Sequence, residues 1–253
     1  MNSARLDSAV VAYQCLTDLN LYDTPDCQKL ATQAAAGRYL FILSHDISTQ
    51  EEDALAVQLW EDDYPGWLAK CDFDRLIPVS HLPEPPTLSR SRIIQAIPAA
   101  VAFTYRAMVV HRYYLWGGTV APNYDCSGLM QAAFRSAGVW LPRDAYQQEG
   151  FLDPVKWAVV KRGDLVFFGT ANRATHVGLY LGQGRYIHSS GSEEGRNGIA
   201  IDVLSEAGDR VSRHYFSQLR GFGRINYSYK PVGRKFEAIV ESAHTGLHFR
   251  DFF

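Results

Sequence analysis

The sequence has few cysteines, no long apolar run and no surplus of positive charge. Four of its 253 residues are cysteine, and their spacing argues against both a disulfide framework and a structural zinc site. No stretch approaches the roughly 18 to 20 apolar residues of a membrane helix. Basic and acidic residues number 25 and 27, so nothing favours nucleic acid or an anionic membrane surface as a partner.

The beginning of the chain lacks a second kind of signal. The first ten residues, MNSARLDSAV, contain no apolar core of the length that a secretory signal needs. We therefore expect a cytoplasmic protein with reduced thiols. Composition does not predict an oligomeric state.

The chain divides into two parts of different pattern. Between residues 10 and 80, short apolar runs alternate with turn residues, which is typical of a small β-barrel. Three prolines within 83–86 remove backbone donors and predict a stiff linker. The following pattern favours a helix over 98–113 that begins near Pro98, then a second helix, then strands. We predict an α+β chain with a domain at 1–80, a linker at 81–91, a domain at 92–230 and a tail at 231–253.

Cys126 falls at the start of the second predicted helix. Leu129, Ala133 and Ala137 repeat every four residues, and Asp125 stands where a capping residue is expected. A thiol at a helix start meets free backbone N–H groups and the positive end of the dipole, which favour the thiolate. We expect a lowered pKa and faster alkylation than at the other three cysteines. Burial as a small apolar residue is the alternative.

Two histidines flank a predicted β-hairpin. His176 opens the run HVGLYL, and His188 closes the run RYIH after the loop 182–184. A three-residue loop places His188 opposite Gly178 and His176 opposite Ser190, so the histidines become diagonal neighbours on one face. His176 is then able to act as a base while His188 orients it. A two-residue loop would place them on opposite faces.

The same three side chains allow a metal interpretation. A catalytic zinc takes three protein ligands and keeps one open position. Cys126, His176 and His188 would supply three ligands. Spacing alone does not decide between a nucleophile with its base and a zinc site.

Six blocks of sequence resemble the NlpC/P60 cysteine peptidases in order and spacing. They are YLWGG at 114–118, DCSGL at 125–129, LPR at 141–143, GDLVFF at 163–168, HVGLYLG at 176–182 and IH at 187–188. Residues 10 to 80, with the run DYPGW, resemble the bacterial SH3 (SH3b) domain. The resemblance implies an SH3b-like β-barrel followed by a papain-like α+β catalytic domain.

The resemblance also implies roles for individual residues. Cys126 would be the nucleophile, His176 the general base and His188 the residue that orients it, with no cofactor and no metal. Family members hydrolyse peptidoglycan stem peptides, commonly between γ-D-Glu and a diamino acid. Tyr114 matches the family tyrosine near the nucleophile. It would donate to the oxyanion beside the backbone N–H of Cys126, or it would serve only in packing.

One position departs from the family pattern and suggests the substrate. Asp144 follows Leu-Pro-Arg, where relatives commonly have Thr or Ser. A free stem peptide begins with the ammonium of L-Ala, and we expect Asp144 to bind it unless Asp144 only caps a turn. The acidic run 61–63 is expected either to close that end of the cleft, with Asp63 and Tyr64 as binding residues, or to be a solvated loop.

Two further residues flank the nucleophile and are candidates for substrate binding. Ser127 is expected to touch the substrate backbone. Asp125 is expected either to contact the substrate as well or only to cap the helix. The sequence thus predicts an endopeptidase for L-Ala-γ-D-Glu-diamino acid peptides that serves in wall-peptide recycling. Three alternatives stay open: an amidase or acyltransferase on the same fold, a non-catalytic wall-peptide binding module, and a secreted wall hydrolase anchored by its SH3b domain.

Overall fold

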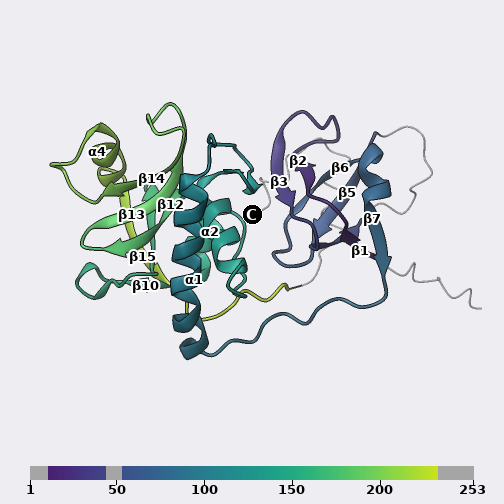
Figure 1. The fold of residues 1–253 in the computed structure, drawn as a ribbon, viewed down its shortest axis with the longest axis horizontal. Coiled ribbons are helices and arrows are strands. Elements are labelled where there is room, and N and C mark those ends of the chain that lie inside the picture. The colour runs from purple at the N-terminus through teal and green to yellow at the C-terminus, as the bar shows by residue number, and fades with distance from the viewer. Residues whose placement is uncertain (1–10, 44–52, 233–253) are drawn as a thin grey trace, which may run out of the picture. The chain divides into compact units, whose positions relative to one another are not determined.

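The structure, a computed structural model, describes residues 11–43 and 53–232 (Figure 1). The described residues form two compact units, one of residues 11–43, 53–84 and 231–232 and one of residues 85–230. The predicted tail at 231–253 lies outside the described residues beyond Val232. Across the described ranges, no helix has both the length and the apolar character required to cross a membrane.

The first unit is a seven-stranded antiparallel sheet with the strand order β3-β2-β6-β5-β4-β1-β7. Its elements are β1 (Ala12–Cys15), β2 (Leu19–Tyr22), β3 (Leu30–Ala34), β4 (Tyr39–Ile42), β5 (Ala54–Leu59), β6 (Pro65–Ala69), the 3₁₀ helix η1 (Lys70–Arg75) and β7 (Leu76–Val79). Apolar runs at 19–22, 39–43, 54–60 and 67–69 coincide with β2, β4, β5 and β6. The run 15–16 overlaps β1 only at Cys15, and β3 and β7 have weaker patterns that were not predicted. Buried side chains such as Leu21, Leu40 and Leu68 form the core of the sheet.

The acidic run of the first unit is largely buried, so its interpretation as a solvated loop is wrong for two of its three residues. Glu61 and Asp62 both pair with the buried guanidinium of Arg38, at 2.5 Å from Nε and 2.9 Å from Nη2. A buried charge is tolerated when it is paired and hydrogen-bonded, which explains two carboxylates here. These two side chains stabilise the turn after β5.

The second unit combines a six-stranded sheet, in the order β10-β15-β11-β12-β13-β14, with helices and a short two-stranded sheet, β8 and β9. Its elements are α1 (Arg90–Val109), β8 (Thr119–Val120), β9 (Asn123–Tyr124), α2 (Cys126–Arg135), α3 (Ala145–Phe151), β10 (Asp153–Val155), the 3₁₀ helix η2 (Trp157–Val159), β11 (Leu165–Gly169), β12 (Ala174–Gly182), β13 (Arg185–Ser190), β14 (Gly198–Val203), α4 (Arg210–Phe216) and β15 (Leu219–Arg224). The predicted α+β class is confirmed.

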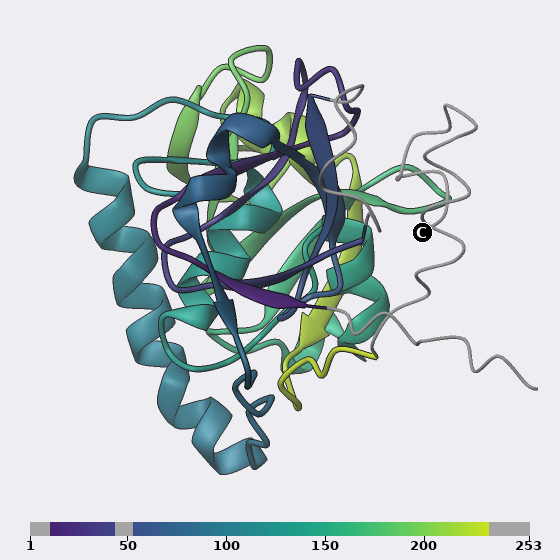
Figure 2. The same cartoon turned by 90° about the vertical axis from the view of Figure 1, so that its right-hand side faces the viewer.

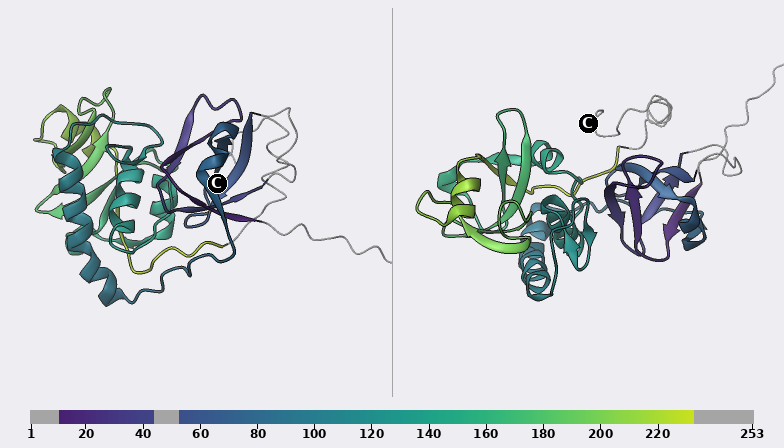
Figure 3. Two further views of the ribbon diagram at one scale, coloured as in Figure 1. Left: turned by 45° about the vertical axis from the view of Figure 1, so that its right-hand side comes forward. Right: turned by 90° about the horizontal axis from the view of Figure 1, so that it is seen from above.

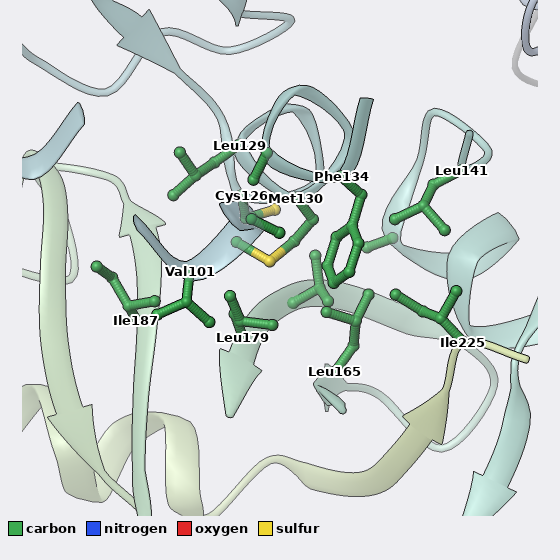
Figure 4. Close-up of a cluster of buried hydrophobic side chains, with 14 of the residues drawn as sticks. Val101, Cys126, Leu129, Met130, Phe134, Leu141, Leu165, Leu179, Ile187 and Ile225 are labelled. Carbon is green, nitrogen blue, oxygen red and sulfur yellow. The ribbon is translucent and has the colours of Figure 1, made fainter. Parts of the chain in front are cut away.

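Successive side chains along these strands point to opposite faces of the large sheet, and both faces are apolar. Leu179 and Ile187 pack with α1 and α2 in one cluster, shown in Figure 4. Tyr180 and Tyr186, one position away on the same strands, join Val211 of α4 in another cluster. Helices therefore cover both faces, and the right-hand view of Figure 3 shows α4 apart from α1 and α2. The strands that carry the predicted site are thus fixed from both sides.

Helix α1 begins earlier than the sequence predicted. It starts at Arg90, where the hydroxyl of Ser89 accepts a hydrogen bond from the Arg92 amide at 3.4 Å. Pro98 therefore lies inside the helix and not in its first turn. Proline removes one backbone hydrogen bond, yet the helix continues through it in one piece, as Figure 2 shows. Burial of Ile93 and Val101 on the sheet side explains why packing overrides that loss.

The hairpin has the predicted register where it matters for the histidines. The predicted three-residue loop is wrong, because Gly182 pairs with Arg185 and leaves only residues 183 and 184 in the turn. A bulge between Tyr180 and Gly182 offsets this difference, so Leu179 pairs with Ile187 and Tyr180 with Tyr186 as predicted. A Cβ at Gly178 would approach the Tyr186 ring to 2.8 Å. Glycine at this position therefore leaves room for the side chains opposite it, among them His188.

Candidate active site

The start of α2 is fixed by a buried carboxylate. Asp125 caps the helix, since its Oδ1 accepts from the Gly128 amide at 2.6 Å. Its Oδ2 accepts from the Gly117 amide at 2.9 Å. A Cβ at Gly128 would lie only 2.0 Å from the carbonyl oxygen of Gly118, so glycine permits the close approach of this loop to the helix. The capping alternative for Asp125 is confirmed.

Arg143 joins the same network, although sequence reasoning gave it no role. Its guanidinium is 1% exposed and binds both carboxylate oxygens of Asp125, and it donates to Ser127 Oγ at 3.0 Å. A planar guanidinium matches a carboxylate with two parallel bonds, which fixes both groups. Ser127 Oγ is therefore engaged within the protein, and its predicted contact with substrate stays a prediction.

Cys126 lies at the first position of α2 and is 6% exposed. Its sulfur lies at the edge of the apolar cluster in Figure 4. Burial, followed by the charge of Asp125, raises the pKa of the thiol to about 12, while the backbone amides of Val177 and Ser127 oppose the rise. The expectation of a lowered pKa is wrong, because burial outweighs the helix terminus. The hydrogen bond from the Val177 amide places the thiol next to Val177, which directly follows His176 in the chain.

The two histidines are brought together as predicted. His176 Nε2 and His188 Nδ1 lie 2.7 Å apart in a hydrogen bond, with both rings buried. Burial, the neighbouring His188 and His214 lower the pKa of His176 well below its ordinary value. Burial also lowers the pKa of His188. Both imidazoles are therefore neutral near pH 7.

A carboxylate that the sequence analysis missed lies behind the pair. His188 Nε2 is 2.8 Å from Oδ2 of Asp202, which belongs to β14. Arg196 bonds to both oxygens of Asp202, and Ser212 Oγ donates to Oδ1 at 3.0 Å. Burial alone would raise the pKa of Asp202, but hydrogen bonds from His188 and Arg196 lower it below its usual range. Asp202 is thus a permanent anion at neutral pH.

Helix α4 contacts both histidines through one ring. Tyr215 stacks on His176 with ring centroids 4.2 Å apart and an interplanar angle of 22°. Its ring meets that of His188 edge-on at 5.0 Å. The hydroxyl donates to Ser190 Oγ at 3.0 Å, which fixes the ring. The sequence gave no signal for this tyrosine, because its helix was not predicted.

A pocket of about 460 Å³ opens on the face of His176. Tyr114 lines it together with Trp116, Glu194 and His214. Burial and the nearby Cys126 raise the pKa of Tyr114 above its ordinary value, so its hydroxyl keeps its proton and is able to donate. The pocket gives a ligand access to the imidazole from solvent.

Asp144 is the N-cap of α3. It forms a capping box with Gln147, whose side-chain oxygen accepts from the Asp144 amide at 3.0 Å. The capping alternative is therefore confirmed, and Asp144 Oδ1 also lies 4.0 Å from Nη1 of Arg143. Asp144 follows Arg143 directly and so lies close to the start of α2. Its predicted contact with an ammonium stays a prediction.

Tyr64 and Asp63 belong to the first unit. Tyr64 is buried in the core of that unit, and its amide donates to Asp62 Oδ1 at 3.2 Å. Asp63 has a φ of +56°, and its Oδ2 accepts from the Val232 amide at 2.7 Å. These contacts explain the turn after β5. The predicted binding roles of Tyr64 and Asp63 stay predictions.

The metal interpretation gains no support from the geometry. The nitrogens of His176 and His188 that face each other are joined by a hydrogen bond and do not converge on a common point. Within 11–43 and 53–232, no group of three or more His, Cys, Asp and Glu side chains has an arrangement for a metal ion. The site is better described as a thiol beside a linked pair of imidazoles.

Comparison with known proteins identifies the domains. Residues 111–220 match the model of the NlpC/P60 family. The chain carries an NlpC/P60 domain. Residues 21–73 match the bacterial dipeptidyl-peptidase SH3 domain, so an SH3b domain precedes the NlpC/P60 domain. Both domains agree with the resemblance inferred from the sequence.

Curated relatives of the NlpC/P60 domain include enzymes with different stated specificities. The bifunctional muramidase/DL-endopeptidase CwlT of Bacillus subtilis is 39% identical over 116 residues, which is 44% of this chain and 32% of CwlT. The gamma-DL-glutamyl hydrolase of Bacillus subtilis is 39% identical over 97 residues, 37% of this chain and 22% of that protein. The murein DD-endopeptidase MepH of Escherichia coli is 35% identical over 126 residues, 47% of this chain and 45% of MepH. The chain thus spans less than half the length of each.

A solved structure of an NlpC/P60 family protein from Bacillus cereus also resembles the chain. It is 24% identical with a TM-score of 0.43, and the match covers 86% of this chain and 64% of that one.

Proposed function

We propose that the chain is a cysteine endopeptidase that hydrolyses the bond between γ-D-Glu and a diamino acid in peptidoglycan stem peptides. The observation that carries the proposal is the thiol of Cys126 at a helix start beside the hydrogen-bonded pair of His176 and His188. A module that only bound wall peptides would need neither a thiol nor a linked imidazole pair. An NlpC/P60 domain with this arrangement is suited to acyl transfer through a covalent intermediate.

The ionisation of the site determines how the thiol becomes a nucleophile. The pKa of Cys126 is raised and that of His176 is lowered, so both groups are neutral at rest. His176 therefore acts as a general base and removes the thiol proton as sulfur attacks the carbonyl carbon. A preformed thiolate–imidazolium pair is not required.

The reaction then runs in two balanced steps. The S–C bond forms, the C–N bond breaks, and His176 returns the proton to the leaving amine of the diamino acid. Water next attacks the thioester carbonyl carbon and gives a proton to His176, so that a C–O bond forms and the C–S bond breaks. The acid is released, and His176 gives its proton to the Cys126 sulfur, which restores the thiol. The backbone N–H of Cys126, in the first turn of α2, and the hydroxyl of Tyr114 donate to the oxyanion in both steps.

The choice of bond and of substrate rests on two observations. Two relatives are named for DL-endopeptidase and gamma-DL-glutamyl hydrolase activity. Asp144 directly follows Arg143, which is ion-paired with the buried Asp125, and supplies a carboxylate suited to the ammonium of a free L-Ala. We infer that the substrate is a released peptide, L-Ala-γ-D-Glu-diamino acid, and that the activity serves the recycling of such peptides.

The test compares three peptides followed by mass spectrometry. The purified chain is incubated with L-Ala-γ-D-Glu-meso-diaminopimelate, with its N-acetylated form, and with a peptide containing a D-Ala-meso-diaminopimelate cross-link. Cleavage of the first peptide alone supports the bond, the chemistry and the recognition of the amine. Cleavage of both γ-D-Glu peptides keeps the endopeptidase and discards the amine pocket. Cleavage of the cross-linked peptide alone replaces the proposed specificity with that of the DD-endopeptidase relative.

Two variants test the chemistry separately from folding. Cys126→Ser keeps the size of the side chain and should lose nearly all hydrolysis, with the circular dichroism spectrum unchanged. Cys71→Ser is the matched control, because Cys71 is an exposed thiol in the other unit and its loss should leave activity intact. Activity retained by Cys126→Ser would refute the nucleophile. Acyl transfer to an added amine without hydrolysis would favour the acyltransferase alternative.

A further inference from the structure

Asp202 has every acceptor position occupied, although it lies in the protein interior. His188 Nε2 and Arg196 Nε bond to its Oδ2 at 2.8 and 3.1 Å. Arg196 Nη2 and Ser212 Oγ bond to its Oδ1. The carboxylate is 2% exposed. An ionised carboxylate only accepts hydrogen bonds, so all four atoms that face it must carry hydrogens.

This requirement determines where the proton lies on each imidazole. His188 must hold its hydrogen on Nε2, because Nε2 faces the carboxylate of Asp202. A neutral imidazole has one N–H, so His188 Nδ1 is an acceptor. His176 Nε2, which faces that nitrogen at 2.7 Å, must then be the donor. The remaining nitrogen of His176, Nδ1, is left with a lone pair.

We propose that Asp202, paired with Arg196, is a positioning residue that sets the tautomers of His188 and His176 and so makes Nδ1 of His176 the basic nitrogen. The inference rests on the proposed function only where catalysis is concerned; the tautomers themselves follow from the hydrogen bonds. Without Asp202, His188 is free to hold its hydrogen on Nδ1. That hydrogen would face His176 Nε2 and force His176 into the tautomer that is unable to accept a thiol proton.

Arg196 has a distinct part in this arrangement. An unpaired carboxylate beside His188 would stabilise the imidazolium, which carries hydrogens on both nitrogens. Arg196 compensates the charge of Asp202 and also bonds to Asp209, the N-cap of α4. Asp202 and Arg196 together therefore fix the orientation of His188 and leave its imidazole neutral. Loss of Arg196 should raise the pKa of His188 and move the acid limb of activity upward.

Several other charged or titratable groups surround the two rings, and the pH behaviour depends on all of them. His188 is surrounded by Tyr186 of its own strand, His176 of β12, Asp202 of β14, Glu194 and Arg196 of the segment between β13 and β14, and Tyr215 of α4. His176 is influenced by His188, Asp202, His214 and Tyr215. Arg196 and Asp202 are the oppositely charged pair in direct contact with each other, so they are the informative pair to change.

The first measurement reads the tautomers directly. Long-range ¹H–¹⁵N correlation spectra of the histidine-labelled full chain distinguish Nδ1–H from Nε2–H rings. In the unaltered protein, His176 and His188 should both be Nε2–H at pH 7.5. In Asp202→Asn the neutral amide offers one oxygen, for which Arg196 competes, and a Nδ1–H population should appear at both rings. Unchanged tautomers in Asp202→Asn would overturn the proposal, even if the peptidase activity itself were absent.

The second measurement compares kinetics with a matched control. Asp202→Asn should lower kcat about 10- to 100-fold, the usual range for residues that orient a reacting group, with KM changed less than about twofold. Asp164→Asn is the control, since Asp164 is 3% exposed and ion-paired with Arg224, but touches neither histidine. An equal loss of kcat in both variants would mean general destabilisation and would refute the positioning role.

The third measurement tests the charge balance. Arg196→Met should shift the midpoint of the acid limb of kcat/KM to higher pH, because the uncompensated Asp202 favours protonated His188. Arg224→Met, which leaves Asp164 without its partner, should not shift it. An acid limb that stays in place in Arg196→Met would show that Arg196 does not control the ionisation of His188.

Discussion

Arg143 binds the carboxylate of Asp125 through two parallel hydrogen bonds, Nη2 to Oδ2 at 2.5 Å and Nη1 to Oδ1 at 3.1 Å. Asp125 is also the N-cap of α2, the helix that begins with Cys126. The ion pair therefore connects the segment before α3 to the nucleophile. Arg143 Nη1 also donates to Ser127 Oγ. A substitution at Arg143 therefore affects Asp125, Ser127 and the start of the helix that carries Cys126.

Removal of Arg143 should be costly for stability. Arg143→Met leaves a buried carboxylate without its counter-ion, and we expect the free energy of unfolding to fall by about 3–5 kcal/mol. Arg220→Met is the matched control in the same unit, because its pair with Glu149 is partly exposed and should contribute about 1 kcal/mol or less. Calorimetry of the full chain measures both. Equal losses in the two variants would contradict a special contribution from the Asp125 pair.

The sequence predicted the catalytic candidates because local rules determine their placement. A four-residue apolar repeat after Asp125 predicts the helix of Cys126, and loop length determines the face of His176 and His188. The predicted loop length was wrong by one residue, and the diagonal contact is present because a bulge between Tyr180 and Gly182, which no sequence pattern indicated, offsets that error. Where a short-range pattern decides the geometry, sequence reasoning is sufficient.

The supporting residues were missed because their partners come from other elements. Asp202 is 14 residues from His188 and Arg143 is 18 residues from Asp125, and neither pairing leaves a periodic pattern. One usable signal was a carboxylate inside the apolar strand GIAIDV, since a buried acid needs a partner. Tyr215 lies on α4, whose short polar sequence gave no helical signal. A hydrogen bond from its hydroxyl to Ser190 Oγ fixes the position of that ring.

The reactivity of Cys126 should be the opposite of what its helix position alone predicts. Burial raises the pKa of its thiol to about 12, and little thiolate exists near neutral pH. We expect iodoacetamide at pH 7 to alkylate the exposed Cys71 before Cys126, as followed by peptide mass spectrometry. The alkylation rate of Cys126 should still be rising at pH 10. Faster labelling of Cys126 at pH 7 would show that its thiolate is stabilised after all.

The pH dependence of hydrolysis follows from the lowered pKa of His176. Burial, His188 and His214 favour the neutral imidazole, and only the neutral form accepts the thiol proton. Activity is therefore present above the lowered pKa and is lost only as the pH falls through it. We expect kcat/KM for the N-acetylated or free peptide, whichever is cleaved, to have an acid midpoint well below 6.5, the ordinary value. A midpoint at or above that value would contradict a neutral base shaped by burial.

The two roles of Asp144 are separable by substitution. Asp144→Asn keeps an N-cap for α3 but removes the charge, whereas Asp144→Ala removes both. We expect Asn to raise KM for the free peptide about 10- to 100-fold, the loss of one charge-assisted hydrogen bond, with little change for the N-acetylated peptide. Alanine should add a loss of about 1 kcal/mol in stability. Equal KM changes for both peptides in Asp144→Asn would refute recognition of the ammonium.

Tyr114 offers a test that separates oxyanion donation from packing. Its pKa is raised by burial and by Cys126, so the hydroxyl remains a donor at every pH where the enzyme works. Tyr114→Phe keeps the ring and removes the donor, and we expect kcat to fall about 100-fold or more with KM nearly constant. Tyr180→Phe is the control, since its hydroxyl accepts from the Gly184 amide in the hairpin turn. If Tyr114→Phe retains full kcat while Tyr114→Ala loses stability, the residue serves only in packing, and the Cys126 amide is left as the donor proposed for the oxyanion.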